Sequence, residues 1–219
     1  MVRWIRCLIA LMVLCGLTVT TRASDETDVK EAAKAFANAL SKGDADQAKQ
    51  HATSDEVTVA IIVNLSPLVV ASNRLHDAAV AKFGKDGEDL APNPAANMSE
   101  WSKSADQSLA KIAGDVAMLT PKPEPSTKPV APQDQPQPLR FKKEGGQWKV
   151  DLSAMSTPAQ MKQTAPRYKA VAEAMNSTAQ QITEGKFKDA KIAALALQQN
   201  VNAAVQRAAP AGAGGRSGQ

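Results

Sequence analysis

The chain has 219 residues, with 26 basic and 22 acidic residues and only two cysteines, Cys7 and Cys15. Three of its arginines precede Ser24, so the remainder is close to neutral and gives no electrostatic reason to expect a nucleic-acid partner. That remainder contains no cysteine, which excludes a disulfide, a thiol nucleophile and a thiolate metal site there.

The first residues predict a secretory signal peptide, residues 1–23. Two arginines precede an apolar run over residues 7–19, and small residues lead to cleavage between Ala23 and Ser24. The run is shorter than the ~20 residues that a membrane span needs. We expect an exported protein, periplasmic or extracellular, without membrane attachment after cleavage. Lipidation of Cys15 and retention of the segment as an uncleaved anchor are alternatives.

Apolar residues at helical spacing predict a first helix over residues 29–40, which Gly43 ends. Asp44 is suited to cap a short second helix that runs to Ala52. Residues 57–63 are rich in β-branched side chains and fit a strand, but one apolar stripe continues from residue 57 to 83. We expect a long helix kinked at Pro67, or two coaxial helices with Ser66 capping the second.

The middle of the chain is ambiguous. Residues 91–97 are rich in Pro and Asn and predict a loop. Residues 99–113 fit a helix closed by Gly114, but 108–112 and 116–120 fit two strands that turn at Gly114 and Asp115. Spacing alone leaves both interpretations open.

A β-hairpin over residues 139–152 is the clearest motif. Gly145 and Gly146 provide a two-residue turn, which places Phe141 opposite Val150 and Lys143 opposite Trp148. Because strand side chains alternate, these four point to one face, together with Leu139 and Leu152. Arg140 and Asp151 then form an opposite-charge pair on the solvated face.

Residues 121–138 hold seven of the 13 prolines and predict an extended, mobile insertion. We expect the strands on either side of it to pair, so that it interrupts one sheet and is not a domain boundary. Its Pro129–Pro132 spacing also fits a proline-helix ligand, but a spacer is the favoured interpretation.

The last part of the chain predicts a helical hairpin, residues 158–208. Pro158 opens a long helix, Glu184 and Gly185 break it, and a second helix begins near Phe187. We favour docking of this hairpin on the same chain over pairing with another molecule. The Gly/Ala-rich residues 209–219 predict a disordered tail.

Three segments resemble the nuclear-transport-factor-2-like (SnoaL-like) cone fold: VKEAAKAFANALSKGDADQAKQH, AGDVAMLTP and LRFKKEGGQWKVDL. The segment RLHDAAVAKFG with the hairpin and helical end is also similar to a group of uncharacterised exported bacterial proteins. The resemblance covers about residues 29–152 and favours strands after Ser108 and a helix over 57–83. It implies a reduced cone-type α+β domain, residues 24–157, with helices on a small antiparallel sheet. Some relatives of this fold are isomerases or dehydratases, and many are binding modules.

Candidate chemistry is sparse. His51 and His76 lack metal-ligand spacing with another His, Asp or Glu, so a surface or capping role is favoured. Trp101 fits a plug of the cone mouth or a pocket wall, and Trp148 fits a cation–π contact with Lys143. We name His76, Trp101 and Trp148 as possible pocket-lining residues and expect no catalytic, cofactor or metal site.

The sequence therefore predicts an exported, non-catalytic binding or interaction module with an unknown protein or small-molecule partner, as a monomer or homodimer. One alternative is a small-molecule-binding protein or a lyase or isomerase that uses the cone pocket. A further alternative is a structural envelope protein that assembles through the C-terminal helical hairpin.

Overall fold

The computed structural model describes residues 24–90, 93–121 and 138–208. In chain order these contain an N-terminal helix (24–41), α2 (Ala45–Gln50), α3 (Glu56–Phe83), α4 (Lys85–Glu88), α5 (Pro94–Gln107), β1 (Leu109–Ala113), β2 (Val116–Thr120), β3 (Leu139–Glu144), β4 (Gln147–Val150), the short 3-10 helix η2 (Ser153–Met155), α6 (Pro158–Thr183) and α7 (Ala190–Ala208). The predictions for the signal peptide, for most of the proline-rich insertion and for the tail lie outside the described residues.

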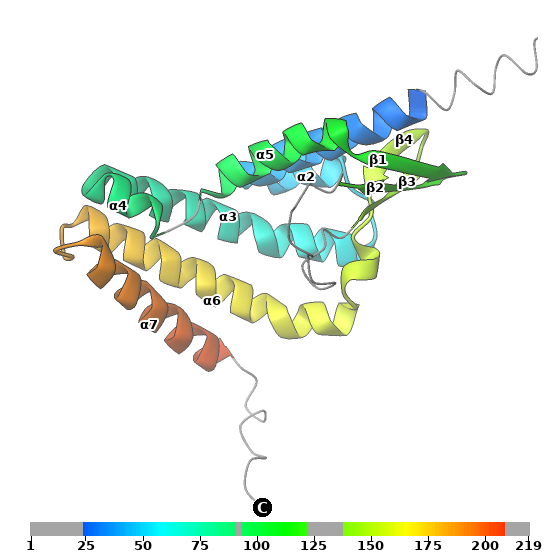
Figure 1. Ribbon diagram of the computed structural model, residues 1–219. Helices are drawn as coiled ribbons and strands as arrows, with labels where there is room; N and C mark the ends of the chain where they lie inside the picture. The colour runs from blue at the N-terminus through cyan, green and yellow to red at the C-terminus, as the bar shows by residue number, and fades with distance from the viewer. Residues whose placement is uncertain (1–23, 91–92, 122–137, 209–219) are drawn as a thin grey trace, which may run out of the picture.

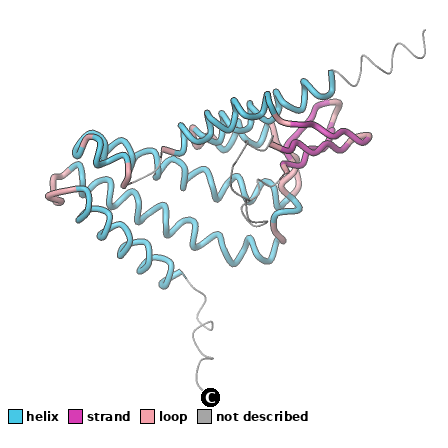
Figure 2. The backbone as a smooth tube through the Cα atoms, viewed as in Figure 1, coloured by secondary structure: helices cyan, strands magenta, loops and turns pink. Residues whose placement is uncertain are grey.

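The long helix α3 forms the middle of the molecule (Figure 1). The N-terminal helix and α5 lie along one side of it, and α6 lies along the other side with α7 beyond. The sheet is gathered at one end, near the start of α3 (Figure 2). This is the predicted α+β fold, with helices on a small antiparallel sheet and a C-terminal helical hairpin.

The sheet is an antiparallel meander in the order β1-β2-β3-β4. The predicted hairpin is confirmed, with Phe141 opposite Val150 and Lys143 opposite Trp148. Gly145 and Gly146 have φ of 58° and 81°, the left-handed values that a two-residue turn of this kind requires.

The two edges of the sheet differ. The outer edge of β4 is paired at its last residue, where the N–H of Val150 donates to the carbonyl of His51 and the N–H of Thr53 donates to the carbonyl of Val150, both at 2.9 Å. β1 forms the opposite edge, and among the described residues only β2 pairs with it.

The ambiguous middle segment contains both a helix and strands. β2 pairs with β3 across the proline-rich insertion, Leu119 opposite Leu139, which confirms that the insertion interrupts one sheet. The expected loop over residues 91–97 is wrong at its C-terminal end, because α5 already begins at Pro94. Its N-cap is Asn93, whose side chain accepts a hydrogen bond from the N–H of Ala96, and proline at the first helical position is favourable there.

α3 is one continuous helix of 28 residues and contains Pro67, so the alternative of two helices capped by Ser66 is wrong. The hydroxyl of Ser66 is buried and has no hydrogen-bond partner in the described part of the chain. The predicted end of the first helix is confirmed at Gly43, which lies against the middle of α3: a Cβ there would come within 2.3 Å of the side chain of Val70. Gly43 also has φ of 69°, so both its conformation and its packing favour glycine.

Two hydrophobic clusters lie along α3. The first joins the sheet to the N-terminal helix, α2, α5 and the start of α3, and its fully buried large members include Val29, Ile62, Leu119, Phe141 and Val150. The second joins the end of α3 to the hairpin of α6 and α7, and its buried members are Leu75, Ala79, Ala179, Ile182 and Ala193. Each end of α3 therefore depends on a different set of partners.

The C-terminal hairpin packs on α3, as favoured from the sequence, through α6. Thr157 and Gln160 form a reciprocal capping box at its start, and Gly185 ends it with φ of 74°. α7 begins at Ala190, three residues later than the expected Phe187, which instead packs against the second cluster.

Among the described helices, α3 alone is long and apolar enough to cross a membrane by length and composition. A third of its most apolar stretch is buried in the fold, at 33%. A helix in the core of a folded domain can have the same length and apolar composition.

A buried polar network joins the start of α3 to the end of β4. The hydroxyl of Thr58 accepts a hydrogen bond from the N–H of Leu152 at 3.0 Å and lies 3.2 Å from the hydroxyl of Thr53. Asp55 caps α3 by accepting from the N–H of Thr58 at 2.9 Å. Burial acts to raise the pKa of Asp55, but the bonds from Thr53 and Thr58 outweigh it and hold that pKa below its usual range.

We predict that Thr58→Val lowers the free energy of unfolding by ~1–3 kcal/mol, because the N–H of Leu152 loses its acceptor in a buried site. Urea unfolding followed by circular dichroism measures this change. Thr183→Val is the matched control, since Thr183 is exposed and its hydroxyl bonds only within α6. Equal stability of the two variants would contradict the role assigned to Thr58.

Candidate functional site

The three possible pocket-lining residues lie in different surroundings. Trp148 is buried in the first cluster, and Trp101 on α5 is half-buried and packs against the same cluster. His76 is half-buried on α3, directly after Leu75 of the second cluster. The structure thus brings the two tryptophans to one core and places the histidine beside the other.

Trp148 is held by Asp25, an acidic residue in the first turn of the N-terminal helix. The indole N–H of Trp148 donates to the carboxylate of Asp25 at 3.0 Å, and the ammonium of Lys143 lies 2.7 Å from the same oxygen. The predicted cation–π contact is confirmed, with the nitrogen of Lys143 5.3 Å from the centre of the Trp148 ring. The bonds from Lys143, and then from Trp148, hold the pKa of Asp25 below its usual range.

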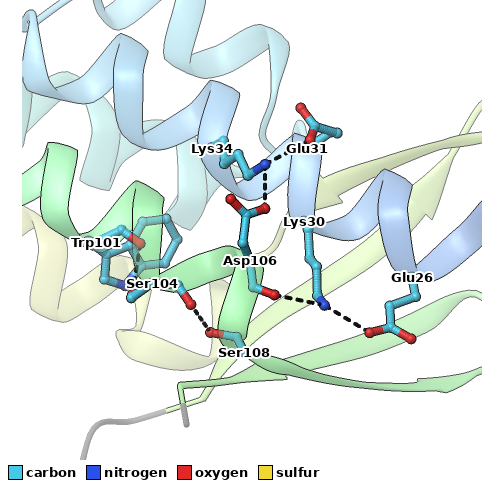
Figure 3. A network of polar contacts seen from close by, with 8 residues as sticks. All are labelled: Glu26, Lys30, Glu31, Lys34, Trp101, Ser104, Asp106 and Ser108. Atoms are coloured by element: carbon cyan, nitrogen blue, oxygen red, sulfur yellow. Dashed lines mark hydrogen bonds and ion pairs between the residues drawn. The ribbon is translucent and has the colours of Figure 1, made fainter. Parts of the chain in front are cut away.

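A second polar network fastens the N-terminal helix to the end of α5 (Figure 3). Lys34 forms an ion pair of 2.5 Å with Asp106, and Lys30 donates to the backbone carbonyl of Asp106 at 3.2 Å. Asp106, and then Glu31, raise the pKa of Lys34. Lys30 satisfies a carbonyl at the C-terminal end of α5, where backbone oxygens lack partners within the helix.

Trp101 belongs to this region without joining the ion pairs. Its backbone carbonyl accepts from the hydroxyl of Ser104 at 2.8 Å, and the carbonyl of Ser104 accepts from the hydroxyl of Ser108 at 2.9 Å (Figure 3). These bonds close the last turns of α5 before β1 begins. The half-buried indole packs against the first cluster.

Asp151 is paired as predicted, but its surroundings are different. Its carboxylate lies 3.3 Å from Arg140 and accepts from the N–H of Ser153 at 3.0 Å. The expectation of a solvated side chain is wrong, because Asp151 is only 6% exposed. The turn into η2 covers it, and Ser153 and Arg140 provide the hydrogen bonds that a buried carboxylate needs.

The surface that the structure describes has open hollows, and two of them lie beside α7. One, of about 580 Å³, lies between α4 and the start of α7 and is lined by Asp86, Asp89, Leu90 and residues 189–191 and 194. The other, of about 430 Å³, lies between α6 and α7 and includes Glu173, Asn200 and Arg207. Neither is lined by His76, Trp101 or Trp148.

Metal-binding chemistry finds no support in residues 24–90, 93–121 and 138–208, where no group of three or more His, Cys, Asp or Glu side chains is placed to hold an ion. Asp86, Asp89 and Asp189 line one hollow but do not converge into such a group. Of the proposed cleavage pair, Ala23 lies outside the described residues, and Ser24 is the first residue of the N-terminal helix as described.

Comparison with protein-family models, with curated proteins and with solved structures finds no match to this chain. The resemblance to the cone fold therefore stays a prediction, since a four-stranded meander with helices on it is compatible with several architectures.

The ionisable groups with shifted pKa share one property. These groups are Asp25, Lys34, Asp55, Lys143 and Glu184. In the three carboxylates of this set the pKa is lowered, and in the two lysines it is raised, so each of these shifts favours the charged form. A general acid or base instead needs a pKa brought towards the working pH. These shifts are those of structural ion pairs and caps.

We predict that Asp25→Asn lowers the melting temperature at pH 7 and has no effect in strong acid. Because the pKa of Asp25 is lowered in the folded state, its carboxylate stabilises the fold at pH values above its ordinary pKa of 3.8. This contribution is lost as the pH falls through the folded-state pKa. Thermal melts of wild type and variant between about pH 2 and pH 7 measure the difference.

The exposed carboxylate of Glu100 on α5 provides the control, as Glu100→Gln. A melting-temperature difference between wild type and Asp25→Asn that stays constant across the whole pH range would contradict the assignment to the ion pair with Lys143.

Proposed function

We propose that this chain is an exported, non-catalytic interaction module that binds another protein through the outer face of α7. The observation that carries the proposal is the poor burial of that helix. Only two of its 19 residues, Ala193 and Ala204, are buried, and both are alanines. Ile192 and Leu195 lie one turn apart and are 45% and 65% exposed.

The α6–α7 contact leaves this face available. The two buried α7 residues in it are alanines, Ala193 packs in the second cluster with Ile182 of α6, and the amide of Asn200 donates to the buried hydroxyl of Thr178 at 3.2 Å. This contact shields little of the outer helix, in which only Ala193 and Ala204 are buried. Large apolar side chains on a solvated helix face are typical of protein contacts.

The absence of catalysis in this proposal is supported by the direction of the pKa shifts, which all favour the charged form. Export is proposed from the first 23 residues of the sequence. Assembly of an envelope structure from copies of this chain is the second candidate, and the same exposed pair, Ile192 and Leu195, favours it.

We predict that the double variant Ile192→Ser, Leu195→Ser loses the native complex while its thermal stability stays close to that of wild type. Loss of ~2 kcal/mol of apolar burial weakens binding ~30-fold, whereas exposed side chains contribute little to folding. Native mass spectrometry of residues 24–219, purified from the envelope fraction of its own host, measures the complex.

Val63→Ser with Met155→Ser is the matched control, because both side chains are exposed and apolar but lie on α3 and η2. A mass that fits wild type plus a different protein supports the first candidate, and a multiple of its own mass supports the second. A bare wild-type monomer, or an α7 variant that keeps the complex, would overturn the proposal.

A further inference from the structure

The outer face of the sheet, which points away from the first cluster, concentrates positive charge. The strand register places Lys111, Met118 and Arg140 in one row and Val116, Lys142 and Lys149 in the next. Lys111 and Lys142 are exposed, and Arg140 and Lys149 are half-exposed. On this face the acidic residues are Asp151, which is buried and paired with Arg140, and Glu144 at the turn.

Two of these cations are placed where they destabilise the sheet. Lys142 lies directly opposite Lys149 on the neighbouring strand, and like charges in that position repel each other. No carboxylate among the described residues forms an ion pair with Lys111, Lys142 or Lys149. On the core face of the same strand, by contrast, Lys143 is fully engaged with Asp25 and Trp148.

The overall charge does not account for this face. Apart from the arginines that precede Ser24, basic and acidic residues nearly balance, so the cations of the sheet are a local concentration. Local charge of one sign attracts a partner of the other sign and sets its orientation. The repulsion between Lys142 and Lys149 decreases when an anionic group binds between their two ammonium groups.

We infer that the outer sheet face, defined by Lys111, Arg140, Lys142 and Lys149, binds an acidic segment of a partner protein; this inference rests on the proposed function as an interaction module. The half-buried side chains of Val116 and Met118 lie between the cations and provide apolar contact for the methylene groups of the acidic side chains in such a segment. In an extended segment, alternate side chains point the same way at the ~7 Å repeat that separates Arg140 from Lys142 along β3.

A nucleic acid and a lipid bilayer fit this face less well. Single-stranded nucleic acid binds on exposed aromatic side chains, and the outward positions of these four strands include none. A flat anionic bilayer would also lie close to Glu144 and be repelled by its carboxylate, whereas a single peptide segment can bind without approaching Glu144. Both are tested below as competitors.

The experiment measures fluorescence anisotropy of a labelled ten-residue glutamate peptide with residues 24–219. We expect wild type to bind the peptide and the double variant Lys142→Gln, Lys149→Gln to bind it about tenfold more weakly. The double variant Lys142→Arg, Lys149→Arg keeps both positive charges and should bind as wild type does. Lys103→Gln with Lys162→Gln is the control of equal net charge, because both lysines are exposed on α5 and α6. The melting temperature of Lys142→Gln with Lys149→Gln should equal or exceed that of wild type, since a repulsive pair is removed.

Three results would overturn the inference: no binding of the peptide by wild type, an equal loss in the control variant, or displacement of the peptide by phosphatidylglycerol vesicles or oligothymidylate but not by unlabelled peptide. Failure here leaves the proposed function standing if the native complex is still lost in Ile192→Ser, Leu195→Ser. Peptide binding without any native complex would instead support this face and remove the role of α7.

Discussion

The fold depends on covering α3. This helix is about 42 Å long and apolar enough in length and composition to cross a membrane, so most of its circumference needs contacts within the protein. The first cluster packs the sheet and the N-terminal helix against its first half, and the second cluster packs α6 and the start of α7 against its second half, while α6 lies alongside it. The contact of α6 with α3 explains why the C-terminal hairpin is part of the same folded unit.

The polar contacts attach the remaining elements to this helix and to the sheet. The N-terminal helix is fastened at two places, to α5 through Lys30 and Lys34 and to the hairpin through Asp25. The start of α3 is joined to β4 by the buried hydroxyl of Thr58. These charged and hydroxyl groups therefore orient the helices, and the outer sheet face and the outer face of α7 take no part in these contacts.

Much of the fold was predictable because its signals are local. The glycine pair at 145–146 determines the hairpin register, and the apolar stripe through Pro67 identifies α3. The start of α5 was missed because the prolines around Asn93 indicate a loop equally well. The site was less predictable: the pairing of Asp25 with Trp148 joins residues 123 positions apart, and the burial of Asp151 results from a turn that follows it. Neither feature has a signal in its own segment. An acidic residue such as Asp25 is, however, a reasonable candidate partner for a hairpin that contains Lys143 and Trp148.

The difference between the two sheet edges limits how copies of this protein associate. His51 and Thr53 occupy the outward N–H and carbonyl of Val150, so the end of β4 is less open to a new strand than β1, which among the described residues pairs only with β2. Joining two copies through β1 would use the open edge of both, and the resulting eight-stranded sheet would end on each side at a β4 whose last residue is already paired. The short segment before α3 then hinders further pairing at β4, because a strand added there would have to displace it from Val150.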